Sequence, residues 1–269
     1  MGEAIVFTSG KGGVGKTTTI ANIGAELSQL DKKVVMLDAD MGLRNLDVVM
    51  GMENLINYNL LDLLENKCRI NQAIIRDRRY PNLYMIPASL KLRKWEEYEI
   101  SFQRIIRQLK KEFDYCLIDC PAGMDSGFKF AISGADRAIV VTTPHISSIR
   151  DASRIVYLLE CNHFSNINLI INDYNERLVK HNDMLSKEDI EEILDMESLG
   201  VIPNDKKINI SQNRGVPVVS MHSKSFKQYK SISNKIISLN LLPDDLNYKS
   251  AEVLDFFNRK GKTVSYENI

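Results

Sequence analysis

The stretch that decides the fold is residues 10–18, which read GKGGVGKTT. It follows a short apolar run, residues 4–8, and precedes a segment of helical periodicity, residues 17–29. A glycine-rich loop between a strand and a helix turns successive backbone N–H groups toward an anion at the helix N-terminus. Because the G-x-x-x-x-G-K-[ST] pattern occurs here in that setting, the sequence predicts a phosphate-binding loop.

Two lysines and a threonine of this loop are expected to contact the phosphates or the metal ion. Lys16 is expected to reach the β- and γ-phosphates, and Thr17 to give its hydroxyl to Mg²⁺. Lys11 is a second lysine, and a cation there could stabilise charge developing on the γ-phosphate, as an arginine finger does; the alternative is a solvated surface lysine. We therefore expect ATP and Mg²⁺ as ligands. The expected nucleotide contacts in the loop are Gly10, Lys11, Gly12, Gly13, Val14, Gly15, Lys16, Thr17 and Thr18.

Three carboxylates follow two further apolar runs. Asp38 and Asp40 come after residues 33–37, and Asp119 ends the run 115–118. The carboxyl ends of parallel strands line the ligand crevice of an open α/β sheet. Asp40, with Asp38 beside it, could orient the attacking water or hold Mg²⁺ through water; helix capping is the alternative for Asp40. Asp119 has the Walker B arrangement and should lie near the metal.

Short β-rich runs alternate with helical segments along the chain. Several runs are nearly continuous in Val, Ile and Leu, as in parallel sheets covered by helices on both faces. The expected strands are residues 4–8, 33–37, 83–86, 115–118, 137–141, 167–171 and 199–201. The expected helices are residues 17–29, 98–111, 150–161, 187–194 and 226–239. The pattern predicts a three-layer α/β/α sandwich over residues 1–242, followed by a tail, residues 243–269.

Composition narrows the class of protein. The 269 residues include 35 Lys and Arg balanced by 35 Asp and Glu, a composition typical of globular proteins. Neutrality disfavours a protein coated in nucleic acid, although a local basic patch is compatible with a neutral total. No apolar run approaches the ~20 residues of a spanning helix, and the N-terminus lacks a signal-peptide pattern. The four cysteines form no CxxC, which favours reduced cytosolic thiols.

The tail contains a candidate amphipathic, membrane-targeting helix. Its polar side carries Glu252, Asp255 and Arg259, and a weak basic cluster that suits anionic headgroups continues to Lys260 and Lys262. The two acids oppose binding to an anionic surface, so a terminal helix docked on its own domain is the alternative. The apolar side is formed by Ala251, Val253, Leu254, Phe256 and Phe257.

The motifs together resemble the MinD family of deviant Walker A ATPases. GKGGVGKTT, DADMGLRNLDVVMG, DYCLIDCPAG and GADRAIVVTTP carry this resemblance, which spans roughly residues 3–220. It implies a mainly parallel P-loop sheet of seven or eight strands and slow, partner-stimulated hydrolysis of Mg-ATP. It further implies an ATP-dependent homodimer in which Lys11 contacts the partner's nucleotide. Asn172 matches the family's adenine-contacting position, and Pro203 lies in the loop that covers the other side of the base.

The same resemblance implies a role in placing the division septum, from the cytoplasm and the inner face of the cell membrane when ATP is bound. A MinC-like inhibitor and a MinE-like or other topological factor would be the partners. His145 and Ser153 stand where the family usually has Glu and Asp, in the segment that docks these partners. The alternative is a flagellar-number or ParA-like partition ATPase that acts on a polar partner or on DNA. A nitrogenase-type reductase would need cluster-binding cysteines that the sequence lacks.

Overall fold

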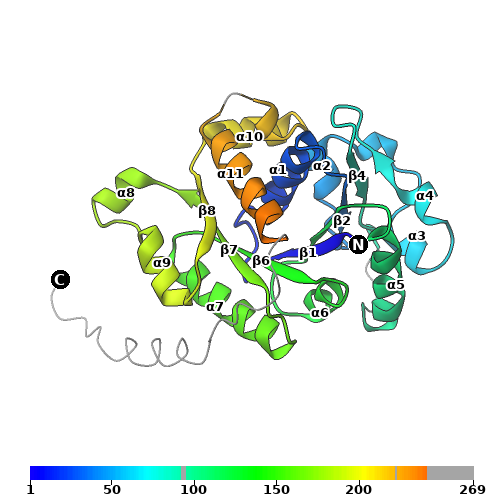
Figure 1. Ribbon diagram of the computed structural model, residues 1–269, viewed down its shortest axis with the longest axis horizontal. Helices are drawn as coiled ribbons and strands as arrows, with labels where there is room; N and C mark the ends of the chain where they lie inside the picture. The colour runs from blue at the N-terminus through cyan, green and yellow to red at the C-terminus, as the bar shows by residue number, and fades with distance from the viewer. Residues whose placement is uncertain (92–94, 222, 241–269) are drawn as a thin grey trace.

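The computed structural model describes residues 1–91, 95–221 and 223–240 (Figure 1). The tail, with its candidate membrane-targeting helix, therefore lies outside the described residues. The strands are β1 (Glu3–Thr8), β2 (Val34–Asp38), β3 (Ile75–Arg76), β4 (Leu83–Ile86), β5 (Tyr115–Asp119), β6 (Arg137–Thr142), β7 (Ile167–Tyr174) and β8 (Ser198–Pro203). The α-helices are α1 (Lys16–Gln29), α2 (Leu46–Met50), α3 (Leu60–Leu64), α4 (Ile70–Ala73), α5 (Glu99–Leu109), α6 (Ser126–Ile132), α7 (Ile146–Cys161), α8 (Glu176–Lys180), α9 (Lys187–Leu194), α10 (Lys206–Asn213) and α11 (Lys224–Leu239). Three short 3-10 helices are η1 (Glu53–Leu55), η2 (Trp95–Tyr98) and η3 (Val218–Ser220).

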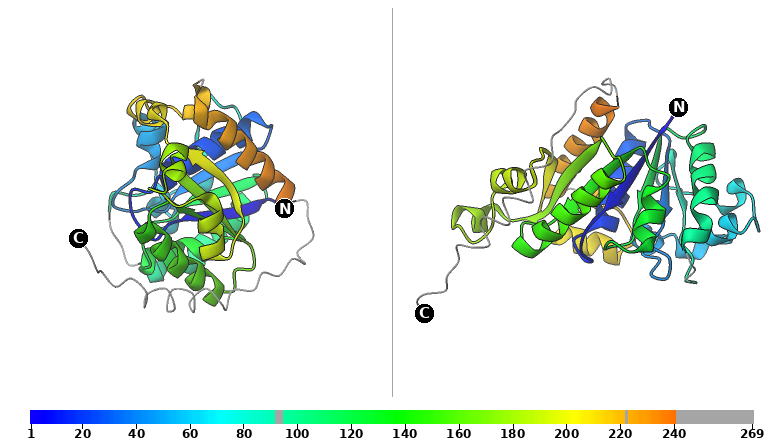
Figure 2. Two further views of the ribbon diagram at one scale, coloured as in Figure 1. Left: turned by 90° about the vertical axis from the view of Figure 1, so that its left-hand side faces the viewer. Right: turned by 90° about the horizontal axis from the view of Figure 1, so that it is seen from below.

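The eight strands form one sheet in the order β3-β4-β2-β5-β1-β6-β7-β8. Only the β3–β4 pair is antiparallel in this sheet, and every other neighbouring pair is parallel. Helices cover both faces, as the two further views show (Figure 2). The expected three-layer, mainly parallel sandwich of seven or eight strands is therefore confirmed.

The central strand shows why both faces need helices. Ala4 and Val6 of β1 pack into a core with α5, α6, α7 and α9, whereas Ile5 and Phe7 pack into a second core with α1 and α11. All four side chains are completely buried. Burial of a large apolar side chain stabilises the fold by roughly 1.5–3 kcal/mol. Because β1 has apolar side chains on both faces of the sheet, helices must cover both faces to bury all of them.

The phosphate loop follows β1, which lies between β5 and β6 in the middle of the sheet. Parallel pairing brings the carboxyl ends of β2, β5 and β1 to the same edge, with Phe7 opposite Asp119 and Asp38 opposite Asp119 in register. The three predicted acidic and phosphate-binding segments therefore meet at one edge. In the part of the chain that the structure describes, no helix is long and apolar enough to cross a membrane.

Candidate nucleotide-binding site

Glycine shapes the phosphate loop. Gly13 and Gly15 have φ angles of 81° and 90°, in the left-handed region that glycine adopts without strain. Gly15 is the N-cap of α1, and its carbonyl accepts hydrogen bonds from the backbone N–H and hydroxyl of Thr19, at 2.9 and 2.8 Å. A Cβ atom on Gly15 would overlap Nδ2 of Asn172. Both its conformation and its surroundings therefore require glycine.

The remaining loop residues divide into a buried end and an open rim. Lys11, Gly12 and Gly13 are exposed, whereas Val14 is buried. Gly10 lies so close to the backbone of α7 that a Cβ atom would come 2.5 Å from a carbonyl oxygen there. The loop thus rests on α7 at its start and leaves its rim open.

Lys16 lies at the buried end, bound to the end of β5. Its Nζ is 2.5 Å from Oδ1 of Asp119, and the two residues are 6% and 1% exposed. Burial lowers the pKa of Lys16, but the neighbouring Asp119 carboxylate outweighs it and leaves the pKa raised. Lys16 is therefore a fixed positive charge at the floor of the loop.

The second oxygen of Asp119, Oδ2, is buried and has no hydrogen-bond partner among the residues described. A buried carboxylate oxygen without a partner is costly, and such an oxygen suits a hard cation. No group of three or more His, Cys, Asp or Glu within the described ranges could hold a metal by itself. Mg²⁺ is typically bound by one or two carboxylates together with waters and substrate phosphates, and Asp119 could supply one such carboxylate.

Two further carboxyl groups lie beside this pair. Asp38 is fully buried, and burial together with the charge of Asp119 raises its pKa to about 8. Asp40 is half-buried; burial raises its pKa, Lys16 lowers it, and the net shift is upward. Both acids are therefore neutralised more readily than ordinary aspartates. The ionised form of Asp38 is stabilised by backbone N–H groups, and that of Asp40 by the charge of Lys16.

Hydrogen bonds separate the roles of the two aspartates. Asp38 accepts the N–H of Asp40 on Oδ1 at 3.0 Å and that of Leu46, the first residue of α2, on Oδ2 at 3.1 Å. The N-cap of α2 is Asn45, so the capping alternative for Asp40 is wrong. Asp38 instead fixes the loop that carries Asp40, while the Asp40 carboxyl group stays half-exposed beside Lys16. Sequence reasoning did not identify this supporting role of Asp38.

The hydroxyl groups at the start of α1 differ in their surroundings. Thr18 is buried, and its Oγ1 accepts a hydrogen bond from Nε2 of Gln212 at 2.5 Å. Thr17 is half-buried, and its hydroxyl makes no hydrogen bond with another described residue. Thr18 therefore connects α1 to α10, and Thr17 is the hydroxyl available to a ligand. The assignment of Thr17, Asp40 and Asp119 to Mg²⁺ stays a prediction.

The predicted base-binding residues lie at the ends of β7 and β8. Asn172 donates from Nδ2 to the carbonyl of Val14 at 2.8 Å, which places it directly beside the phosphate loop. Pro203 is the last residue of β8, and Asn204 follows it. Asn204 donates from Nδ2 to Asp173 at 2.5 Å, which joins the two strand ends. Sequence reasoning missed this last contact because Asn204 belongs to no recognisable motif.

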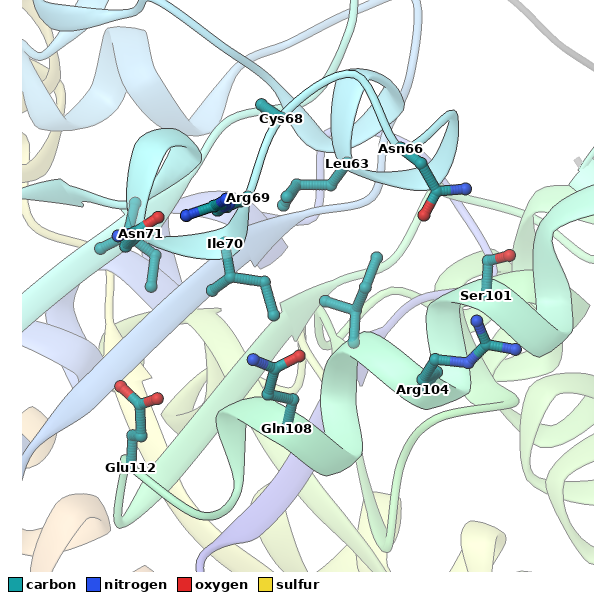
Figure 3. A pocket seen from close by; sticks show the side chains of 12 residues that line it. Leu63, Asn66, Cys68, Arg69, Ile70, Asn71, Ser101, Arg104, Gln108 and Glu112 are labelled. Atoms are coloured by element: carbon teal, nitrogen blue, oxygen red, sulfur yellow. The ribbon is translucent and has the colours of Figure 1, made fainter.

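A hollow of about 470 Å³ lies apart from this site, between the α3–α4 segment and α5 (Figure 3). Its lining includes the apolar side chains of Leu63, Ile70 and Ile105 and the basic side chains of Arg69 and Arg104. None of the predicted nucleotide-site residues lines it. The nucleotide is therefore expected at the strand edge, where glycine loop, lysine and carboxylates meet.

A glycine loop at the N-terminus of α1, a buried lysine and the aspartates at neighbouring strand ends define the class of P-loop ATPases. The family model described as an AAA domain matches residues 2–178. The septum site-determining protein MinD of Bacillus subtilis is 42% identical over 266 residues, which cover 96% of this chain and 98% of that protein. The chain belongs to the MinD family of septum site-determining ATPases.

Solved structures agree with this assignment. The MinC:MinD cell division protein complex of Aquifex aeolicus matches with a TM-score of 0.81 and 41% identity, over 88% of this chain and 96% of that chain. MinD of Pyrococcus horikoshii, solved with Mg-ADP, matches with a TM-score of 0.79 and 29% identity, over 89% and 98% of the two chains.

Proposed function

We propose that this chain is an ATP-dependent switch that helps to place the division septum, with residues 1–242 as its ATPase domain and residues 243–269 as a membrane-binding tail. The two lysines of the phosphate loop carry the proposal. Lys16 is buried against Asp119, whereas Lys11 is exposed and its side chain makes no ion pair with any described residue. A loop lysine that faces outward is free to contact the nucleotide of a second copy.

ATP binding would change the partner of Lys16 from Asp119 to the phosphates. The released carboxylate of Asp119, with the Thr17 hydroxyl, would hold Mg²⁺, which neutralises phosphate charge when bound. Asn172 and the loop at Pro203 would hold the adenine from its two sides. Asp40, on the loop fixed by Asp38, would orient the attacking water, and hydrolysis would yield ADP and phosphate.

Asp40→Ala is expected to bind Mg-ATP within about threefold of the parent but to hydrolyse it at least ~100-fold more slowly, since a positioned proton acceptor contributes about 10²–10⁴-fold. Steady-state phosphate release and ATP affinity would be measured in parallel. Asp125→Ala serves as the control, because it removes an aspartate at the N-cap of α6 that does not belong to the group of Asp38, Asp40 and Asp119. Hydrolysis at the parent rate in Asp40→Ala would assign the water to another residue.

Regulatory partners of this chain are proposed to be a MinC-like inhibitor and a MinE-like or other topological factor. The N-terminal part of α7 supports such a docking surface: Ile146 is 70% exposed, and His145, Arg150 and Arg154 are exposed around it. His145 is the N-cap of α7, and Ser153 is half-buried on the same helix. Because these two positions differ from the family's usual Glu and Asp, the partner should have a correspondingly altered contact surface.

Membrane association is proposed to be peripheral, from the cytoplasm and only in the ATP state. One amphipathic helix of about three turns gives marginal affinity, and stable attachment takes two anchors. A dimer supplies two tails at once. Phe257→Glu is therefore expected to abolish ATP-dependent co-sedimentation with anionic liposomes while leaving ATP binding unchanged.

Thr263→Glu is the matched control for Phe257→Glu. It adds the same charge at a position that follows the apolar residues of the candidate helix in the sequence. It should retain most of the liposome binding, because the apolar face stays intact. If the parent chain with Mg-ATP ignores anionic liposomes, the tail is a docked terminal helix and the membrane proposal is wrong.

A further inference from the structure

Positive charge is concentrated on α10 and α11, although the chain as a whole is neutral. The two helices contain six lysines and no Asp or Glu. Both helices contact η3, and their starts are close to each other in the fold. Asp205 joins their starts, because its carboxylate accepts the backbone N–H of Lys207 at 2.9 Å and both the N–H and the hydroxyl of Ser225, at 3.2 and 3.0 Å.

The lysines of α11 lie on the side of the helix opposite the core. Tyr229, Ile232 and Ile236 are fully buried on the inner side. On the outer side, Lys224, Lys227 and Lys235 are exposed, and their spacing of three and eight residues places them within one stripe. The stripe is about 16 Å long at 1.5 Å per residue.

These cations are not neutralised within the described part of the chain. None of the three makes an ion pair with a described residue, and neither does the exposed Lys206 at the start of α10. Lys230 differs, since its charge lowers the pKa of Glu26, whose overall pKa is raised by burial. We call Lys206, Lys224, Lys227 and Lys235 the basic face. An uncompensated row of lysines attracts a polyanion over a distance set by the Debye length, about 10 Å at 0.1 M salt.

We infer that the basic face is a second contact surface for an anionic lipid bilayer, which acts together with the tail. The inference rests on the proposed membrane association. Its position favours lipid over nucleic acid, because α11 ends at Leu239 and the candidate amphipathic helix starts only about ten residues later. A linker of ten residues spans at most about 35 Å, so a tail inserted in a bilayer limits the distance between the C-terminal end of α11 and the headgroups to about this length.

The contribution of the basic face follows from membrane electrostatics. Each lysine close to an anionic surface strengthens binding by about fivefold at low salt. One short amphipathic helix is marginal, and a polybasic patch on each chain strengthens the attachment that the two tails of the dimer provide. Removal of three lysines should therefore weaken vesicle binding on the order of 100-fold at low salt, and the difference should shrink as salt is raised.

The test uses the full chain with the changes Lys224→Gln, Lys227→Gln and Lys235→Gln together. Co-sedimentation is measured with Mg-ATP on vesicles of phosphatidylcholine with 40% phosphatidylglycerol, and on phosphatidylcholine alone. The matched control is Lys111→Gln, Lys129→Gln and Lys180→Gln, which removes three exposed lysines from other parts of the surface. We expect the large loss only for the first triple variant and only on anionic vesicles, with ATP affinity unchanged in both.

Three outcomes would overturn the inference. The first is equal vesicle binding by the parent and the basic-face variant. The second is an equal loss in the control triple, which would show that net charge alone matters. The third is unchanged vesicle binding with lost binding to a short duplex DNA, which would assign the basic face to nucleic acid. A parent chain that binds no vesicles with Mg-ATP would instead contradict the proposed membrane association itself.

Discussion

Lys16→Ala is expected to abolish measurable ATP binding. The change removes the ammonium group expected at the β- and γ-phosphates, and it leaves three carboxyl groups, those of Asp38, Asp40 and Asp119, around a site that must accept a polyanion. Removal of one partner of a buried ion pair costs the folded chain about 3–5 kcal/mol. The loss of ATP affinity is a separate effect, which comes from the lost phosphate contact. Calorimetric titration with Mg-ATP should show a decrease in affinity of at least ~100-fold. Retained tight binding would refute the assigned role.

A second variant separates binding from folding. Lys16→Ala should also lower the free energy of unfolding, since Asp119, which is 1% exposed in the parent chain, would lose the cation 2.5 Å from its carboxylate. The double variant Lys16→Ala/Asp119→Asn removes the unpaired charge and should recover much of that stability in urea unfolding. Its ATP affinity should stay low. If the double variant regained ATP binding, the defect of Lys16→Ala would be structural, and the phosphate role of Lys16 would be wrong.

The fold could be predicted in large part because its signals are local. The buried strands are short continuous apolar runs, and the helical periodicity of residues 187–194 alone predicts α9 with its observed bounds, Lys187–Leu194. Elements that are too short to show periodicity were not found. The antiparallel strand β3 has two residues, Ile75 and Arg76, and exists because β4 offers a free edge.

Site residues could be predicted where a residue of suitable chemistry stands in the phosphate loop or at the end of a predicted strand. The contacts between these residues could not be predicted. Lys16 and Asp119 are 103 residues apart, and only parallel pairing of β1 with β5 brings them together. The sequence motif describes the state with phosphate bound, so it did not predict this ion pair. The contact between Asn204 and Asp173, next to the predicted adenine-binding residues, depends in the same way on the pairing of β7 with β8.

Lys11→Ala is expected to leave ATP binding almost unchanged and to abolish the ATP-dependent dimer. The physical reason is the placement of the two lysines. Lys16 is 6% exposed and serves the nucleotide of its own chain, whereas Lys11 is exposed on the loop rim without an ion pair to the described residues. A cation that reaches the γ-phosphate of a second copy contributes only when two chains meet, so its loss affects association and not the first binding step.

Sedimentation velocity with Mg-ATP would test this in the Asp40→Ala background, which is expected to block hydrolysis. The control is Lys111→Ala, which removes another exposed lysine, two residues after the end of α5. Lys11→Arg keeps the charge and should retain part of the dimer. Because two tails bind a bilayer far more strongly than one, Lys11→Ala should also lose liposome binding. A dimer of unchanged strength in Lys11→Ala would exclude a contact across the interface, and Lys11 would then be a solvated surface lysine whose charge the partner copy does not use.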